Sequence, residues 1–140
     1  MKGKQTALIP GNEDHVGYWL TPAPLMAQLQ AEFDFTMDAA PFPRPPGWDG
    51  LKEPWGQRTY CNPPFAKGMS IHGWVRKAIQ ERDSGKLVVL VLPVAGWMEL
   101  LLPAEPEIRY LGRVAWVNEE GEATHRARFP SSLFILRPKA

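Results

Sequence analysis

The chain has 140 residues, of which 44% are hydrophobic and 22% are charged, and its formal net charge is +1. This length allows one domain with its own core, because a second domain would leave each half too small to bury enough apolar surface. The composition is that of an ordinary soluble globular protein and favours neither a disordered nor a fibrous one. The net charge excludes the broad basic field of an obligate nucleic-acid binder, so any contact with nucleic acid must come from local patches.

Cysteine and histidine usage and the apolar runs narrow the class further. Cys61 is the only cysteine, which excludes an internal disulfide and a cysteine-based zinc cluster, and the three histidines lack the spacing of a metal motif, so we expect no metal. No apolar run approaches the roughly 20 residues of a membrane helix, and residues 1–6 lead into no signal-peptide stretch. We therefore expect a cytoplasmic protein with no membrane partner.

The N-terminal part of the chain begins without periodicity. Glycine and proline recur over residues 1–17, which predicts an irregular arm. Thr21 and Pro22 have the chemistry of a helix N-cap and a first helical residue, and apolar residues then recur at helical spacing, which predicts a helix over about 22–32. Apolar and polar residues alternate over 33–38, which predicts a short strand.

Proline is concentrated in the middle of the chain. Residues 41–48 carry four prolines and cannot form a helix interior or a central strand, because proline lacks the amide hydrogen and restricts the residue before it. This stretch is predicted to be a long, stiff loop. Long loops inside domains are often functional, but a plain surface linker is the alternative interpretation.

The second half of the chain alternates strand and helix patterns. Residues 58–61 predict a strand, residues 71–79 a helix closed by 83–85, and the continuous apolar run 87–92 a central strand covered on both faces. Short apolar runs predict three more strands at 108–111, 114–117 and 133–136, with a turn at 118–122. Together these patterns predict an α/β fold in three layers, with a mixed sheet that has an antiparallel edge.

The most informative motif is Asn62-Pro63-Pro64-Phe65, which lies between a predicted strand and a predicted helix, where open α/β sheets bind ligands. Two prolines make a stiff turn that fixes where the Asn62 side chain and the Pro63 carbonyl point. These two acceptors can hold both hydrogens of an exocyclic aromatic amine and turn its lone pair toward an electrophilic methyl group, while Phe65 stacks on the ring. Such positioning suits an SN2 methyl transfer. The alternative is a proline turn with an asparagine cap.

Six segments in the same order resemble elements of the phage-type DNA N6-adenine methyltransferase (Dam) family. They run from about Tyr18 to Leu136, which is most of the chain. They are Tyr18-Trp19-Leu20-Thr21-Pro22, Phe35-Thr36-Met37-Asp38-Ala39-Ala40, Asp49-Gly50-Leu51 with Trp55, Tyr60-Cys61-Asn62-Pro63-Pro64-Phe65, Trp74-Val75-Arg76-Lys77-Ala78, and Gly112-Arg113-Val114. The set as a whole is more specific than the tetrapeptide alone.

The resemblance implies that residues 18–140 form a Rossmann-like methyltransferase domain that uses S-adenosylmethionine to methylate the N6 amine of adenine in DNA, with a phage or prophage origin in a bacterial host. It implies that Asp38 contacts the cofactor through its amino group or ordered water, that Asp49 accepts a hydrogen bond from the cofactor's adenine amine, and that Thr21 and Pro22 help to hold the methionine end. Read alone, both aspartates are also typical turn residues, and Thr21 is a typical helix cap.

One departure from nucleotide-binding sheets concerns the turn after the first strand. Such sheets usually place glycines there so that the backbone can approach the ligand, whereas this chain has Ala39-Ala40-Pro41. No acidic residue clearly ends a second strand to bind the ribose hydroxyls either. The cofactor site is therefore less well defined by the sequence than the tetrapeptide.

A chain of this length has no room for a separate target-recognition domain, so loops must contact DNA. Lys67, in the segment after the tetrapeptide, and His125, Arg126 and Arg128, between the last two strands, are candidate phosphate contacts. Solvated loop charges are the alternative interpretation. A base inside a duplex is out of reach, so the target adenine must flip into the pocket or be single-stranded.

Two other functions fit the same sequence. The Asn-Pro-Pro-aromatic geometry also serves methylation of a protein glutamine or a small amine, although such enzymes usually carry the glycine-rich turn. A non-catalytic DNA-binding phage accessory protein that keeps the fold and has lost the cofactor is the other alternative, and the missing glycines favour it.

Overall fold

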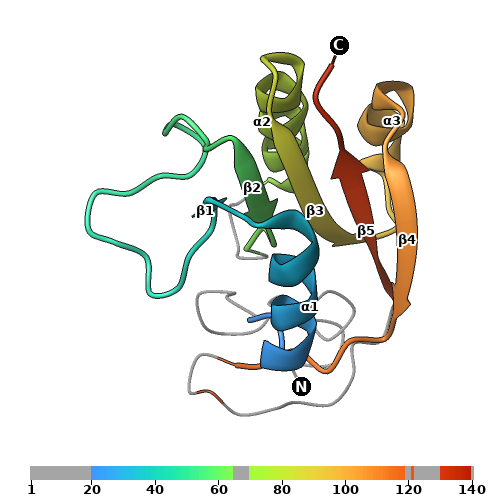
Figure 1. Cartoon of the computed structure of the whole chain (residues 1–140). Helices are drawn as coiled ribbons and strands as arrows, with labels where there is room; N and C mark the ends of the chain where they lie inside the picture. Colours follow the sequence, from blue (N-terminus) through green and yellow to red (C-terminus); the bar gives the residue numbers. More distant parts are fainter. Residues whose placement is uncertain (1–19, 65–69, 119–120, 122–129, 140) are drawn as a thin grey trace.

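A mixed five-stranded sheet organises the chain (Figure 1). The computed structural model describes residues 20–64, 70–118, 121 and 130–139. The strands are β1 (Met37–Asp38), β2 (Arg58–Cys61), β3 (Leu87–Pro93), β4 (Glu107–Gly112) and β5 (Ser131–Leu136), in the sheet order β1-β2-β3-β5-β4. β1, β2 and β3 are parallel neighbours, whereas β5 is antiparallel to both β3 and β4. The predicted α/β class, mixed sheet and antiparallel edge are confirmed.

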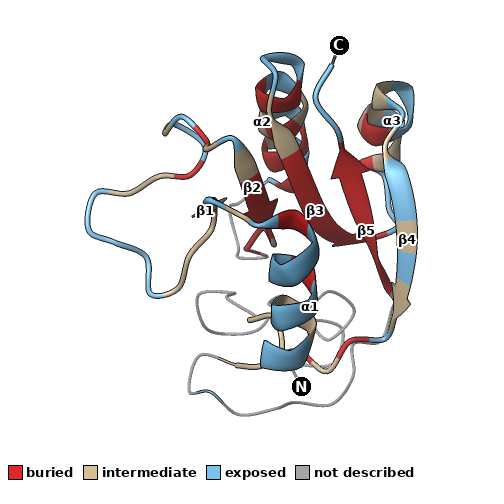
Figure 2. Cartoon of the chain, viewed as in Figure 1, coloured by how far each residue is buried: buried red, intermediate tan, exposed pale blue. Residues whose placement is uncertain are grey.

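Helices cover both faces of this sheet. They are α1 (Ala23–Phe33) on one face, and α2 (Ile71–Asp83) and the short α3 (Met98–Leu101), continued by the 3₁₀ turn η2 (Leu102–Ala104), on the other. Side chains of β3 alternate between the two layers: Val88 and Leu90 pack with α2, and Val89 packs with α1. Figure 2 shows β3 and β5 buried and β4 largely exposed. Burial on both faces explains the unbroken apolar run of β3.

Most predicted elements lie where the sequence patterns put them. Ser70 caps α2 by accepting a hydrogen bond from the Gly73 amide at 3.3 Å, and Gly85, with a positive φ of 107°, follows the end of this helix. The region between β1 and β2, which includes the proline-rich stretch 41–48, contains no helix or strand.

Three local predictions were wrong. Thr21 does not cap α1, which begins at Ala23, and the Thr21 hydroxyl instead bonds to a distant tyrosine. The strand predicted over 33–38 is reduced to its last two residues, because α1 continues through Phe33 and ends at Asp34 in the left-handed conformation (φ 54°). Residues 114–117 form no strand. Val114 and Trp116 turn into the core beside α1, and within the described part of the chain only Val117 pairs, in a single bridge with Leu20.

The sequence patterns did not predict α3 and η2. The arm expected over residues 1–17 lies outside the described residues. None of the described helices is long and apolar enough to cross a membrane. Within the same described ranges, no three His, Cys, Asp or Glu side chains are grouped so that they could hold a metal ion.

Candidate active site

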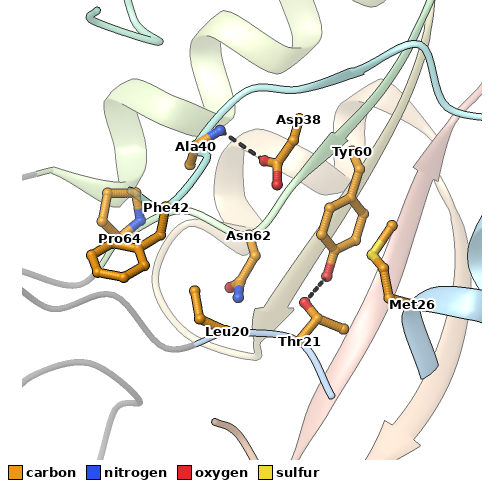
Figure 3. Close-up of a pocket in the computed structure, with 9 residues that line it drawn as sticks. All are labelled: Leu20, Thr21, Met26, Asp38, Ala40, Phe42, Tyr60, Asn62 and Pro64. Atoms are coloured by element: carbon orange, nitrogen blue, oxygen red, sulfur yellow. Dashed lines mark hydrogen bonds between the residues drawn. The ribbon is translucent and has the colours of Figure 1, made fainter. Parts of the chain in front are cut away.

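The carboxyl ends of β1 and β2 meet at one edge of the sheet. Asp38, the last residue of β1, pairs in register with Tyr60 of β2, and Asn62 follows two residues later. All three line a cavity of about 170 Å³, here called the first hollow (Figure 3). Its other lining residues are Leu20, Thr21, Met26, Ala40, Phe42 and Pro64. The first hollow therefore lies where open α/β sheets place their ligands.

The segment Asn62-Pro63-Pro64 continues from the carboxyl end of β2 at this edge of the sheet. Pro63 and Pro64 are buried, whereas Asn62 is half-buried and points into the first hollow. Two buried prolines restrict the backbone on the carboxyl side of Asn62. The backbone that carries the Asn62 side-chain amide is therefore held in place. Phe65, the fourth residue of the predicted motif, lies outside the described residues.

Asp38 is both a turn residue and a lining residue. Its Oδ1 accepts a hydrogen bond from the Ala40 amide at 2.9 Å, and its carboxylate points into the first hollow (Figure 3). Asp38 is exposed to solvent, although protein atoms crowd part of the surroundings of its carboxylate. This partial desolvation raises the pKa of the Asp38 carboxyl, and the hydrogen bond from Ala40 only partly offsets the rise.

A tyrosine that the sequence analysis did not single out closes one side of the first hollow. The Tyr60 hydroxyl lies 2.5 Å from Thr21 Oγ1, and the ring is only 2% exposed. Burial raises the pKa of the Tyr60 phenol well above its usual value, so the phenol keeps its proton. The available signal was spacing: Tyr60 and Asn62 are two residues apart and therefore project to the same side of the chain.

A second hollow of about 330 Å³ adjoins the first, and the two share Ala40 and Pro64 in their walls. Its walls contain two indoles, one carboxylate and one guanidinium group. The lining residues are Ala39, Ala40, Arg44, Trp48, Asp49, Gly50, Leu51, Pro64, Ser70 and Trp74. Asp49 again combines two roles, because its Oδ1 accepts the Leu51 amide at 3.0 Å and the residue still lines the hollow.

Indole hydrogen bonds and one close glycine contact fix the loop that forms the second hollow. The Trp48 Nε1–H donates to the Ala39 carbonyl oxygen at 3.3 Å, and the Trp55 Nε1–H donates to the Gly50 carbonyl oxygen at 2.7 Å. A Cβ atom at Gly50 would lie 2.2 Å from the Ala39 oxygen and 2.7 Å from the Trp74 ring. Gly50 is therefore required for close approach, and this approach holds Asp49 against the end of the sheet.

The structure brings only some of the predicted site residues together. Thr21, Asp38 and Asn62 line the first hollow, Asp49 lines the second, and Pro64 lines both. Pro22 occupies the cap position of α1. Neither Pro22 nor the buried Pro63 lines either hollow. The predicted DNA contacts Lys67, His125, Arg126 and Arg128 all lie outside the described residues.

The two hollows differ in what they can bind. The first presents a carboxylate, a carboxamide and a hydroxyl, which suit a small ligand part that carries an amino group and hydrogen-bonding oxygens. The second presents the indoles of Trp48 and Trp74, which suit a flat ring, and the Asp49 carboxylate, which suits an amine on that ring. The buried Trp74 Nε1–H has no hydrogen-bond partner among the described residues. Together the hollows fit an elongated ligand with one polar end and one aromatic end.

A comparison with protein families gives one match that covers nearly the whole chain. The model described as "DNA N-6-adenine-methyltransferase (Dam)" matches residues 11–140. No curated protein and no solved structure matches this chain.

Proposed function

We propose that this chain, which belongs to the DNA N-6-adenine-methyltransferase (Dam) family, transfers a methyl group from S-adenosylmethionine to the exocyclic N6 amine of adenine in DNA. The observation that carries the proposal is the meeting of Asp38 and Asn62 in one hollow that adjoins a tryptophan-walled hollow containing Asp49. In this proposal residues 18–140 are a Rossmann-like methyltransferase domain. The parallel strands β1, β2 and β3, with helices on both faces, support it.

The donor set of the two hollows fits S-adenosylmethionine. When bound, this cofactor supplies an electrophilic methyl group on a sulfonium centre. In our assignment the Asp38 carboxylate binds the amino group of the methionine end, and Thr21, beside Pro22, binds the same end through its hydroxyl. Trp48 packs against the adenine ring, and Asp49 accepts a hydrogen bond from the adenine amine. The two aspartates lie in adjoining hollows, which suits the two ends of one elongated molecule.

The absence of a glycine-rich turn does not count against this assignment. Ala40 lines both hollows, so its small side chain borders the connection between them. Its amide is already bonded to Asp38, so the turn presents a carboxylate and the Ala40 methyl group where other sheets present bare backbone. The polar contacts to the cofactor then come from side chains.

The chain's own residues explain how a weakly nucleophilic amine becomes reactive. The Asn62 side chain and the Pro63 carbonyl accept the two hydrogens of the target amine, and this turns the lone pair out of conjugation with the ring and toward the methyl group. Buried Pro63 and Pro64 keep these acceptors in place, so geometry supplies much of the rate. We assign to Phe65 a stacking contact with the target base.

DNA is the partner in this proposal, either as a duplex from which the adenine flips or as a single strand. Lys67, His125, Arg126 and Arg128 are the residues that we expect to contact phosphates. Contacts of this kind position the nucleic acid without reading its sequence.

The test is transfer of a tritiated methyl group to DNA with and without adenine, together with calorimetric titration of S-adenosylmethionine. We expect transfer only to the adenine-containing DNA. Transfer to a protein glutamine but not to DNA would favour the alternative substrate. A folded chain that binds no cofactor at millimolar concentration would favour a non-catalytic DNA-binding protein.

Asn62→Ala should lower methyl transfer by about a hundredfold or more, because one positioned acceptor is lost. Cofactor affinity should stay within a few-fold of wild type, since Asn62 orients the acceptor amine and not the donor. Gln80→Ala, which removes an exposed amide on α2, is the control and should leave both quantities unchanged. Turnover of Asn62→Ala within threefold of wild type would refute the role assigned to Asn62.

A further inference from the structure

The buried phenol of Tyr60 borders the first hollow, and the mechanism proposed above does not use it. Tyr60 lies on β2, packs against the Phe35 ring at a centroid distance of 5.3 Å, and is almost fully shielded from solvent. Thr21 Oγ1 is its hydrogen-bond partner among the described residues. The pair is formed by residues 39 positions apart in the sequence. It joins the sheet to the segment that precedes α1.

The direction of this hydrogen bond follows from burial. A buried hydroxyl that leaves its proton unpaired carries a desolvation cost, and among the described residues Thr21 Oγ1 is the acceptor within reach of the Tyr60 phenol. Thr21 is only half-buried and lines the first hollow, so its hydroxyl proton can be donated to water or a ligand in that hollow. The phenol is also the more acidic of the two hydroxyls. These grounds favour Tyr60 as the donor and Thr21 Oγ1 as the acceptor in a pair whose geometry allows either hydroxyl to donate.

The backbone around Thr21 is fixed independently of this bond. Leu20 and Val117 exchange two backbone hydrogen bonds, with N···O distances of 2.7 and 2.9 Å, and the Pro22 carbonyl accepts the Met26 amide at 3.0 Å. Because backbone hydrogen bonds anchor its neighbours on both sides, the backbone of Thr21 is held in place. The orientation of its hydroxyl then depends on the hydrogen bond to Tyr60. The Tyr60 hydroxyl occupies one side of Oγ1 (Figure 3). With Tyr60 as donor, the Thr21 proton is directed away from Tyr60.

We propose that Tyr60 is a positioning residue that makes the Thr21 hydroxyl a hydrogen-bond donor toward the first hollow, and that this donor selects a ligand with a carboxylate. Asp38 on the β1 side of the same hollow is an acceptor for an amino group. A wall that donates and a wall that accepts match the two charged groups of an α-amino acid. This inference rests on the proposed function, in which S-adenosylmethionine places its methionine end in this hollow.

The experiment compares the dissociation constants of S-adenosylmethionine and its decarboxylated analogue by calorimetry. The wild-type chain should bind S-adenosylmethionine about tenfold more tightly than the analogue. Tyr60→Phe keeps the ring and removes only the hydroxyl, and it should weaken S-adenosylmethionine binding about tenfold while leaving binding of the analogue within two- to threefold. The preference for the carboxylate should thus disappear.

Variants of Thr21 test the same hydrogen bond from its other side and do not depend on the folding of Tyr60→Phe. Thr21→Val should lose the same preference, Thr21→Ser should retain it, and the Tyr60→Phe/Thr21→Val double variant should lose no more than either single variant. Tyr110→Phe makes the same chemical change at a side chain that is 73% exposed on β4, and it should bind both ligands as wild type does.

Three outcomes would overturn the inference. Equal weakening of both ligands by Tyr60→Phe would mean that the phenol only supports packing, and full retention of the carboxylate preference in Tyr60→Phe or Thr21→Val would mean that the hydroxyl pair does not select the ligand. In both cases the proposed function would stand, because the wild-type chain binds S-adenosylmethionine. If the folded wild-type chain bound neither compound, the proposed function and this inference would fail together.

Discussion

The two hollows of the candidate site are built by different means. In the first hollow, Asp38 and Tyr60 belong to neighbouring strands, and a parallel ladder of backbone hydrogen bonds sets their register. In the second, Trp48 and Asp49 belong to a loop without helix or strand, which indole hydrogen bonds and the contact at Gly50 hold in place. Backbone hydrogen bonds between strands fix the Asp38 and Tyr60 side of the first hollow, whereas a few side-chain contacts fix the second. Single substitutions should therefore disrupt the second hollow more easily.

Gly50→Ala should have the largest effect on the unfolding free energy. The added Cβ would overlap the Ala39 carbonyl oxygen, which cannot move freely because the Ala39 amide is bonded to the Tyr60 carbonyl at 2.9 Å. The loop must shift instead, at a cost of about 3 kcal/mol in unfolding free energy. Urea denaturation followed by circular dichroism measures this loss.

Gly73→Ala is the matched control for that substitution. A Cβ at this position in α2 meets no atom of the described residues within 4 Å, so the variant should be as stable as wild type or up to about 1 kcal/mol more stable. If Gly50→Ala were as stable as Gly73→Ala, the close contact at Gly50 would not hold the second hollow, and the contrast between the hollows would disappear.

Asp38→Asn should weaken cofactor binding in the first hollow without lowering the unfolding free energy. Cofactor affinity should fall about tenfold, because the charged partner of the amino group is lost. In wild type, affinity should also fall on acidification, starting above the ordinary aspartate value of about 3.9 because the pKa of Asp38 is raised. Calorimetry at a series of pH values measures this dependence, which should be flat in Asp38→Asn. Equal pH dependence in both chains would mean that another group binds the amino end.

The same raised pKa predicts the opposite sign for unfolding. The folded state disfavours the ionised Asp38 carboxyl. Below the unfolded pKa of aspartate, wild type and Asp38→Asn should therefore be equally stable. As the pH rises from that value to the folded pKa of Asp38, wild type should become less stable than Asp38→Asn, and it should remain so at neutral pH. Urea denaturation of both chains at several pH values measures the difference. A wild type that is more stable than Asp38→Asn at neutral pH would contradict this sign.

Trp48→Phe should change the unfolding free energy less than Gly50→Ala does, and cofactor affinity less than Asp38→Asn does. It removes the hydrogen bond to the Ala39 carbonyl and keeps an aromatic face, so unfolding should cost about 1 kcal/mol less than in wild type. Cofactor affinity should fall a few-fold. Trp97→Phe removes a similar indole bond, to the Pro93 carbonyl at 2.8 Å, from a residue that lines neither hollow. It should lower stability without changing affinity, and a loss of affinity there would show that the effect is not local to the second hollow.

Local sequence patterns determined the elements that carry the site. The continuous apolar run of β3 predicted a strand buried on both faces, and the position of Asn62-Pro63-Pro64 between a strand and a helix predicted a site at the end of β2. For Asp38 and Asp49 the two alternatives raised by the sequence turned out to be compatible. Each carboxylate accepts the amide two residues ahead and also lines a hollow.

Long-range packing decided the rest. Thr21 has the chemistry of a helix cap, but in the tertiary structure its hydroxyl is hydrogen-bonded to the Tyr60 hydroxyl. Nothing in the residues around Thr21 specifies a partner 39 positions away. Residues 114–117 have a strand-like pattern, yet they pair only at Val117, because a strand needs a neighbour of matching length and the core beside α1 takes Val114 and Trp116 instead. A sequence fixes local backbone preferences and periodic burial, whereas the choice among several possible partners depends on which segments the folded chain brings within hydrogen-bonding distance.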